Sequence, residues 1–166
     1  MKILIIGLSG SGKSTVAPMI AKKYNLDVME ADDAVTEANG GTWPHFNDEL
    51  MDKVFEETNK KVIKMDNVLY ITAWLTEQRI KDFYNQGFKI IEMHADFEAL
   101  IKRKNSRDGE SVKATERFKN TYISYFETVL SDELKEMYLV SIDTTKLASD
   151  KIFLEIDTAL YTQYDG

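Results

Sequence analysis

The feature that most constrains the fold is the nine-residue segment 7–15, which reads GLSGSGKST and matches the pattern G-x-x-x-x-G-K-[ST] at every fixed position. An apolar segment, residues 3–6, precedes it, and a helical pattern follows from Lys13 to Tyr24. Glycines let the backbone curl so that successive N–H groups point at one anion, and the start of a helix adds a positive end. The segment therefore predicts a phosphate-binding loop between a strand and a helix.

Two side chains of this loop have expected roles in binding a nucleoside triphosphate. Lys13 is expected to reach the β- and γ-phosphates, and the Ser14 hydroxyl to ligate Mg²⁺. The other residues expected to form the cradle are Gly7, Ser9, Gly10, Ser11, Gly12 and Thr15. We therefore predict ATP and Mg²⁺ as cofactors.

The rest of the chain alternates between apolar strand patterns and helical patterns. Strands are predicted at 27–31, 68–72, 88–94 and 137–142, and helices at 46–65, 76–86, 97–104, 113–130 and 149–160. This alternation is typical of a parallel sheet with helices on both faces. The prediction is one α/β domain over residues 1–166: a three-layer α/β/α fold of the P-loop NTPase type. It has a five-stranded parallel sheet and a small arginine-bearing lid at about 104–113.

Composition excludes several kinds of site. The chain has no cysteine and two histidines, which excludes disulfides, zinc–thiolate and iron–sulfur sites, a cysteine nucleophile and a multi-histidine metal site. No apolar run approaches the 18 or so residues of a membrane span. We expect a cytoplasmic protein that does not bind membranes, located in the host cytoplasm if the chain is phage-encoded. Oligomeric state stays open.

Charge is unevenly distributed along this acidic chain, whose net charge is −7. Residues 27–58 contain ten acids and one lysine, a net of −9, whereas residues 102–119 contain seven Lys/Arg and three acids, a net of +4. The overall sign argues against tight binding to duplex DNA. The basic segment is the part of the chain suited to phosphates.

An acidic pair, Asp32 and Asp33, follows the second predicted strand. A carboxylate at the tip of that strand could accept the proton of an attacking hydroxyl, or hold a magnesium-bound water. Alternatively, one aspartate caps a short helix at 34–38. We predict Asp33 as the general base and Asp32 as a metal-side residue.

The third strand ends in Thr72 rather than in an acid, and no N-K-x-D sequence is present. A motor or switch GTPase needs that acid to hold its metal, so the pattern favours a kinase. Thr72 and Arg79 are candidate acceptor contacts, although a plain strand residue and a solvated arginine are the alternatives. Trp43 is a further candidate, as an aromatic wall of the acceptor pocket or as a core anchor.

Arg103 and Arg107 lie four residues apart, on one face if the helix persists. Planar guanidinium groups stabilise the charge that spreads over the phosphoryl oxygens during transfer. We predict catalytic roles for both arginines, with a solvated basic helix face as the alternative.

The chain from Met1 to about Leu160 resembles the small P-loop kinases of the adenylate, shikimate, gluconate and adenylylsulfate kinase group. A closer resemblance, carried by residues 96–112 and the strand-two aspartates, is to phage polynucleotide 5′-hydroxyl kinases. Phage kinases acting on 5-hydroxymethyluracil in DNA are of similar build. The resemblance implies Asp33 as the base and Arg103 and Arg107 as γ-phosphate contacts. Thr36 stands where those kinases carry an arginine for the acceptor phosphate.

Together these observations predict an ATP-dependent kinase with a hydroxyl acceptor. The preferred acceptor is a hydroxyl on nucleic acid or a nucleotide, such as DNA. The alternatives are a small metabolite, such as adenylylsulfate, a shikimate-like alcohol or a sugar acid, and a nucleoside monophosphate. The last would need arginines on the acceptor side, and residues 27–58 contain none.

Overall fold

The computed structural model describes residues 1–44, 47–73, 75–108 and 116–162. The side chains of Arg107 and Asp108 also lie outside the description. Within the described chain, no helix is both long and apolar enough to cross a membrane.

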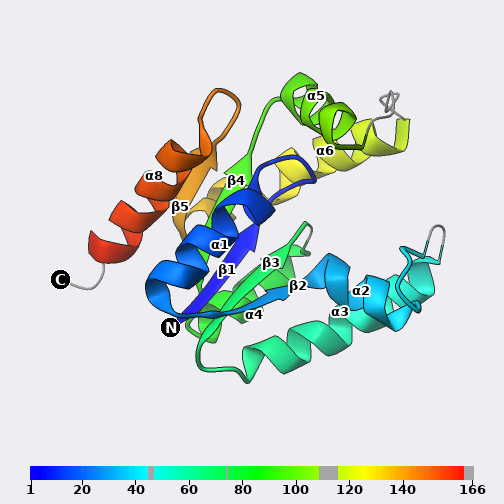
Figure 1. The fold of residues 1–166 in the computed structure, drawn as a ribbon, viewed down its shortest axis with the longest axis horizontal. Coiled ribbons are helices and arrows are strands. Elements are labelled where there is room, and N and C mark those ends of the chain that lie inside the picture. The colour runs from blue at the N-terminus through cyan, green and yellow to red at the C-terminus, as the bar shows by residue number, and fades with distance from the viewer. Residues whose placement is uncertain (45–46, 74, 109–115, 163–166) are drawn as a thin grey trace.

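The five predicted strands form one parallel sheet (Figure 1). Their order is β2-β3-β1-β4-β5, and their bounds are Lys2–Ile6 (β1), Asp27–Glu30 (β2), Val68–Thr72 (β3), Lys89–His94 (β4) and Tyr138–Asp143 (β5). Every pairing is parallel, so all five carboxyl ends lie at one edge of the sheet. Ligands of such sheets bind at that edge.

Helices cover both faces of the sheet, which confirms the three-layer α/β/α prediction (Figure 1). Helices α1 (Lys13–Tyr24) and α8 (Ser149–Thr162) cover one face, where Ile3 and Ile5 of β1 pack with Ile20 and Ile156. The opposite face buries Leu4 and Ile6. Because both faces are covered, β1 reads as an unbroken apolar run in the sequence.

The second face is packed by residues from several further helices. These are α3 (Asp48–Ile63), α4 (Glu77–Asn85), α6 (Glu116–Thr128) and the short α7 (Asp132–Lys135). Val62, Phe83, Tyr125 and Leu134 are their most buried apolar contributions. Short α7 was not predicted separately from the sequence.

Some predicted boundaries differ from the structure. Helix α2 (Ala31–Ala38) begins where the second strand was expected to end, so both strand-two aspartates lie in its first turn. The helix predicted at 97–104 continues as α5 (Phe97–Asp108). The proposed lid at 104–113 is therefore helical as far as residue 108, and its remaining residues lie outside the described chain. Helix α3 begins later than predicted, since the Asn47 side chain accepts a hydrogen bond from the Leu50 N–H at 3.1 Å.

Candidate functional site

The loop between β1 and α1 requires its glycines. Gly10 and Gly12 have φ angles of 92° and 99°, a region that other residues rarely adopt. A Cβ on Gly7 would lie 2.2 Å from the carbonyl oxygen of Met93. The loop therefore curls tightly against the end of β4, as the sequence predicted.

Two polar groups inside this loop are arranged as an anion cradle requires. The Lys13 ammonium is buried and donates to the carbonyls of Gly7 at 2.5 Å and Leu8 at 3.1 Å. The Ser11 hydroxyl is buried and has no hydrogen-bond partner within the described chain. A phosphate oxygen would give both groups an acceptor, so the loop fits the triphosphate predicted for it.

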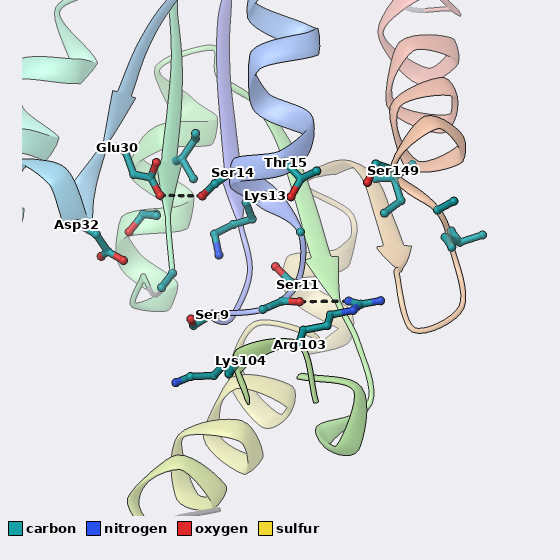
Figure 2. Close-up of a pocket in the computed structure, with 18 residues that line it drawn as sticks. Ser9, Ser11, Lys13, Ser14, Thr15, Glu30, Asp32, Arg103, Lys104 and Ser149 are labelled. Atoms are coloured by element: carbon teal, nitrogen blue, oxygen red, sulfur yellow. Dashed lines mark hydrogen bonds between the residues drawn. The ribbon is translucent and has the colours of Figure 1, made fainter. Parts of the chain in front are cut away.

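A cavity of about 420 Å³ opens at this loop, at the carboxyl edge of the sheet (Figure 2). One side is formed by Glu30, Asp32 and residues 71–73. The other is formed by four residues around the start of α8: Leu147, Ala148, Ser149 and Ile152. Lys13 points into the space between these two sides (Figure 2). The lining of the cavity also includes residues 9–15 of the loop, Arg103 and Lys104.

Glu30, at the end of β2, is a site residue that the sequence analysis missed. Its Oε1 accepts a hydrogen bond from the Ser14 hydroxyl at 2.9 Å (Figure 2). A hydroxyl and a carboxylate are both oxygen ligands, which Mg²⁺ prefers, directly or through its waters. Ser14, Glu30 and nearby Asp32 are thus the residues that fit a metal on the phosphates. The missed signal was an acid two residues before Asp32.

The two aspartates of α2 occupy different positions relative to the cavity. Both side chains are exposed, but Asp32 lines the cavity whereas Asp33 does not belong to its lining. Successive helical residues point about 100° apart, so only one of two neighbours faces a given site. Because α2 begins at Ala31, that one is Asp32.

The Arg103 guanidinium is held in place by hydrogen bonds to Gly10 and Thr144. It donates to the carbonyls of Gly10 at 3.1 Å and Thr144 at 2.5 Å, and to the Thr144 hydroxyl at 3.1 Å. It thereby ties α5 to the phosphate-binding loop and to the loop after β5. Neighbouring Lys104 also lines the cavity, while the side chain of Arg107 lies outside the described residues.

The loop after β5 is held by several hydrogen bonds of its own. The Thr144 hydroxyl, fully buried, lies 3.0 Å from the carbonyl oxygens of Ser11 and His94. The Thr145 hydroxyl and N–H both donate to Asp143, and these bonds lower the pKa of that carboxyl. Through the contact of Thr144 with Ser11, this loop packs against the phosphate-binding loop and supports it.

The four candidate acceptor contacts are not gathered at one place. Thr72 is buried and lines the cavity. Thr36 bonds to the carbonyl of Asp32 within α2 at 2.9 Å, and Trp43 is 37% exposed; neither lines the cavity. Arg79 does not line it either, and forms ion pairs with Glu56 and Asp82.

Comparisons with known proteins identify the family of this chain. The family model described as shikimate kinase matches residues 9–160. A shikimate kinase from Enterococcus faecalis is 27% identical over 160 residues, covering 93% of this chain and 95% of that protein.

Solved structures share the fold. A shikimate kinase from Acinetobacter baumannii in complex with shikimate has a TM-score of 0.72 at 16% identity, covering 98% of this chain and 93% of that one. A gluconokinase from Sinorhizobium meliloti has a TM-score of 0.70 at 18% identity, with 98% and 92% covered. From the family match, the chain belongs to the shikimate kinase family and is an ATP-dependent phosphotransferase that acts on a hydroxyl group.

Proposed function

We propose that this protein transfers the γ-phosphoryl group of ATP to a hydroxyl of a small molecule. The observation that carries the proposal is the position of Asp32 in the same cavity as Lys13 and Ser14. A carboxylate on the acceptor side of a phosphate cradle is what hydroxyl activation requires.

Each residue has a defined task in this reaction. Lys13 and the loop N–H groups hold the β- and γ-phosphates. Ser14 and Glu30 would hold a magnesium ion, which would neutralise phosphate charge when bound. Asp32 orients the acceptor hydroxyl and takes its proton. The acceptor oxygen forms a bond to the γ-phosphorus, the bond from that phosphorus to the β–γ bridging oxygen breaks, and ADP leaves.

Arg103 has a positioning role in this proposal rather than a direct contact with the γ-phosphate. Its hydrogen bonds to Gly10 and Thr144 hold the loop in the curled form that receives phosphate. Lys104, at the same rim of the cavity, is the described cation available beside it. This replaces the role expected from resemblance to polynucleotide kinases.

The preference for a nucleic-acid acceptor is not supported. The Enterococcus faecalis relative, covered to 95% of its length, is a shikimate kinase, and the expected closeness to phage polynucleotide kinases is not shown. The acid-rich segment 27–58 contributes Glu30 and Asp32 to the cavity and would repel a polyanion there. The small-metabolite alternative is therefore the one we propose.

The test is transfer of labelled γ-phosphate from ATP to small hydroxyl compounds, with Asp32→Asn compared with Asp33→Asn. We expect Asp32→Asn to lose about 10²–10⁴-fold in kcat, the usual contribution of a general base. Asp33→Asn makes the same charge change one residue away and should keep near-normal activity. Equal losses in both variants would refute the role of Asp32.

A further inference from the structure

Tyr70 and Asn59 form a buried polar pair close to the cavity. Tyr70 of β3 has no exposed surface, and its hydroxyl donates a hydrogen bond to Asn59 Oδ1 of α3 at 2.8 Å. Asn59 is buried as well, although it is a polar residue inside a helix. Buried polar groups are costly unless they are hydrogen bonded, so each member of the pair stabilises the position of the other.

The pair reaches the cavity through Thr72. Tyr70 and Thr72 both belong to β3, and side chains two positions apart on a strand point to the same face of the sheet. Their hydroxyls are hydrogen bonded to each other. Thr72 is buried and lines the cavity together with Ile71 and Ala73. The buried pair is therefore one hydrogen bond away from a residue that a ligand in the cavity would touch.

The direction of these hydrogen bonds follows from the chemistry of Tyr70. Burial is the main cause that raises the pKa of Tyr70 above its ordinary value of 10, so the hydroxyl stays protonated and neutral. A tyrosine hydroxyl donates one hydrogen bond, and Asn59 accepts it. In the bond with Thr72, the tyrosine oxygen is therefore the acceptor and the threonine hydroxyl is the donor. The Thr72 oxygen can still accept a hydrogen bond, and a hydroxyl of a ligand is a suitable donor.

The same wall of the cavity carries the residue that we propose as the base. Asp32, in the first turn of α2, lines the cavity with Thr72. Besides burial, the charge of Asp32 contributes to the raised pKa of Tyr70. Helix α2 packs against both β3 and α3, the elements that carry Tyr70 and Asn59 (Figure 1). The orientation of Thr72 is thus set beside the carboxylate that an acceptor hydroxyl would meet.

We infer that Tyr70, held by Asn59, is a positioning residue for phosphoryl transfer, and that Thr72 accepts a hydrogen bond from the acceptor compound. This inference rests on the proposed function and adds a specific contact to its acceptor side. A threonine side chain has three staggered positions, and the bond to Tyr70 selects one of them before a ligand arrives. A contact fixed in advance does not have to be ordered when the ligand binds. Tyr70 itself is fully buried and acts through Thr72.

The first test compares Tyr70→Phe, which removes only a hydroxyl, with Tyr138→Phe. Tyr138 also donates from a buried hydroxyl, to the carbonyl of Val129 at 2.5 Å, and it does not belong to the cavity lining. Transfer of labelled γ-phosphate from ATP is measured on a panel of small hydroxyl compounds that includes shikimate and gluconate. We expect Tyr70→Phe to lower kcat/KM for the compound used about tenfold and to leave KM for ATP within about twofold. Tyr138→Phe should lose stability without changing either constant.

A second set of variants tests whether Tyr70 acts through Thr72. Thr72→Val removes the hydroxyl at nearly the same volume and should also lower kcat/KM for the acceptor about tenfold. Thr72→Ser, which keeps the hydroxyl, should recover most of that loss. The double variant of Tyr70→Phe and Thr72→Val should lose about tenfold rather than about a hundredfold, because both changes break the same contact.

The outcomes separate this inference from the proposed function. Equal kinetic constants in Tyr70→Phe and Tyr138→Phe would mean that Tyr70 only stabilises the fold. A loss of about a hundredfold in the double variant would mean that the two residues act independently. Either result would overturn the positioning role and leave the kinase proposal standing. Transfer by the wild type to no compound of the panel would overturn both.

Discussion

The Ser14 hydroxyl donates a hydrogen bond to Glu30 across the gap between the start of α1 and the end of β2, at 2.9 Å. The pair joins the phosphate-binding loop to the side of the cavity formed by Glu30 and Asp32. Both groups offer oxygen to a hard cation, so ATP·Mg²⁺ would bind both residues at once.

Glu30→Gln should therefore weaken the response to magnesium more than the binding of ATP alone. We expect the Mg²⁺ concentration for half-maximal transfer to rise about tenfold, since a charged metal-side oxygen is replaced by a neutral amide. A magnesium titration at saturating ATP measures this. Glu37→Gln, an exposed acid on α2, is the control; a similar shift in both would show only a general loss of negative charge.

Arg103→Ala should reduce both stability and ATP binding. Four hydrogen bonds from its guanidinium end on Gly10, Thr144 and Thr145, and their loss leaves buried carbonyls without donors. We expect a loss of about 1–3 kcal/mol in the free energy of unfolding and a higher KM for ATP. Urea denaturation and steady-state kinetics measure the two effects. Lys102→Ala, an exposed neighbour, should change neither.

Gly7→Ala should damage the loop more than an equivalent change elsewhere. The new methyl group would meet the carbonyl oxygen of Met93 at 2.2 Å and the Ser11 hydroxyl at 2.6 Å, and the Met93 backbone cannot move aside easily. Gly87→Ala is the comparison: its φ is +79° but no atom lies within 4 Å of the added carbon, so the cost is about 1 kcal/mol of backbone strain.

Two measurements distinguish these glycine variants. Gly87→Ala should be stabilised by ATP·Mg²⁺ as much as the wild type is. The gain in the free energy of unfolding is about 2.7 kcal/mol at roughly 100 times the dissociation constant, and it is measured as a thermal shift. Gly7→Ala should lose most of it in addition to a larger loss of stability. A normal ligand-induced shift in Gly7→Ala would contradict the close fit of the loop against β4.

The sequence predicted correctly those parts of the fold that depend on residues close together in the chain. The nine loop residues follow one pattern, and the apolar runs of β1 and β3 can only be central strands, so both were identified correctly. The sequence pattern alone could not decide between Asp32 and Asp33. The choice depends on where α2 begins, because a shift of one residue turns a side chain by about 100°. Helix starts are the least certain feature of a sequence pattern.

Residues that act through tertiary contacts could not be predicted. Glu30 matters because Ser14, 16 residues away, lies opposite it, and Thr144 because it meets Ser11 from 133 residues away. Arg79 shows the same limit. Its type and place suggested an acceptor contact, yet Glu56 of another helix pairs with it. No spacing rule in a single sequence connects such partners.

The buried carboxylate of Glu92 and its neighbour His94 make the free energy of unfolding depend on pH. Glu92 of β4 is fully buried and accepts from Tyr125 at 2.7 Å and Ser141 at 2.6 Å, and it lies 2.8 Å from His94 Nδ1. This hydrogen bond is the main cause that raises the pKa of His94 above its usual value of 6.5. The stabilisation from protonated His94 is therefore complete below about pH 6.5 and is lost as pH rises through the higher folded-state pKa.

His94→Gln should thus cost more stability at about pH 6 than at about pH 9, because the wild-type ion pair is present only at the lower value. Urea denaturation of both proteins across this range measures the difference. Ser141→Ala removes a hydrogen bond to the same carboxylate without removing a titrating group, so its cost should change little with pH. A constant difference between wild type and His94→Gln would show that His94 does not change its protonation state within this range, which would contradict the prediction.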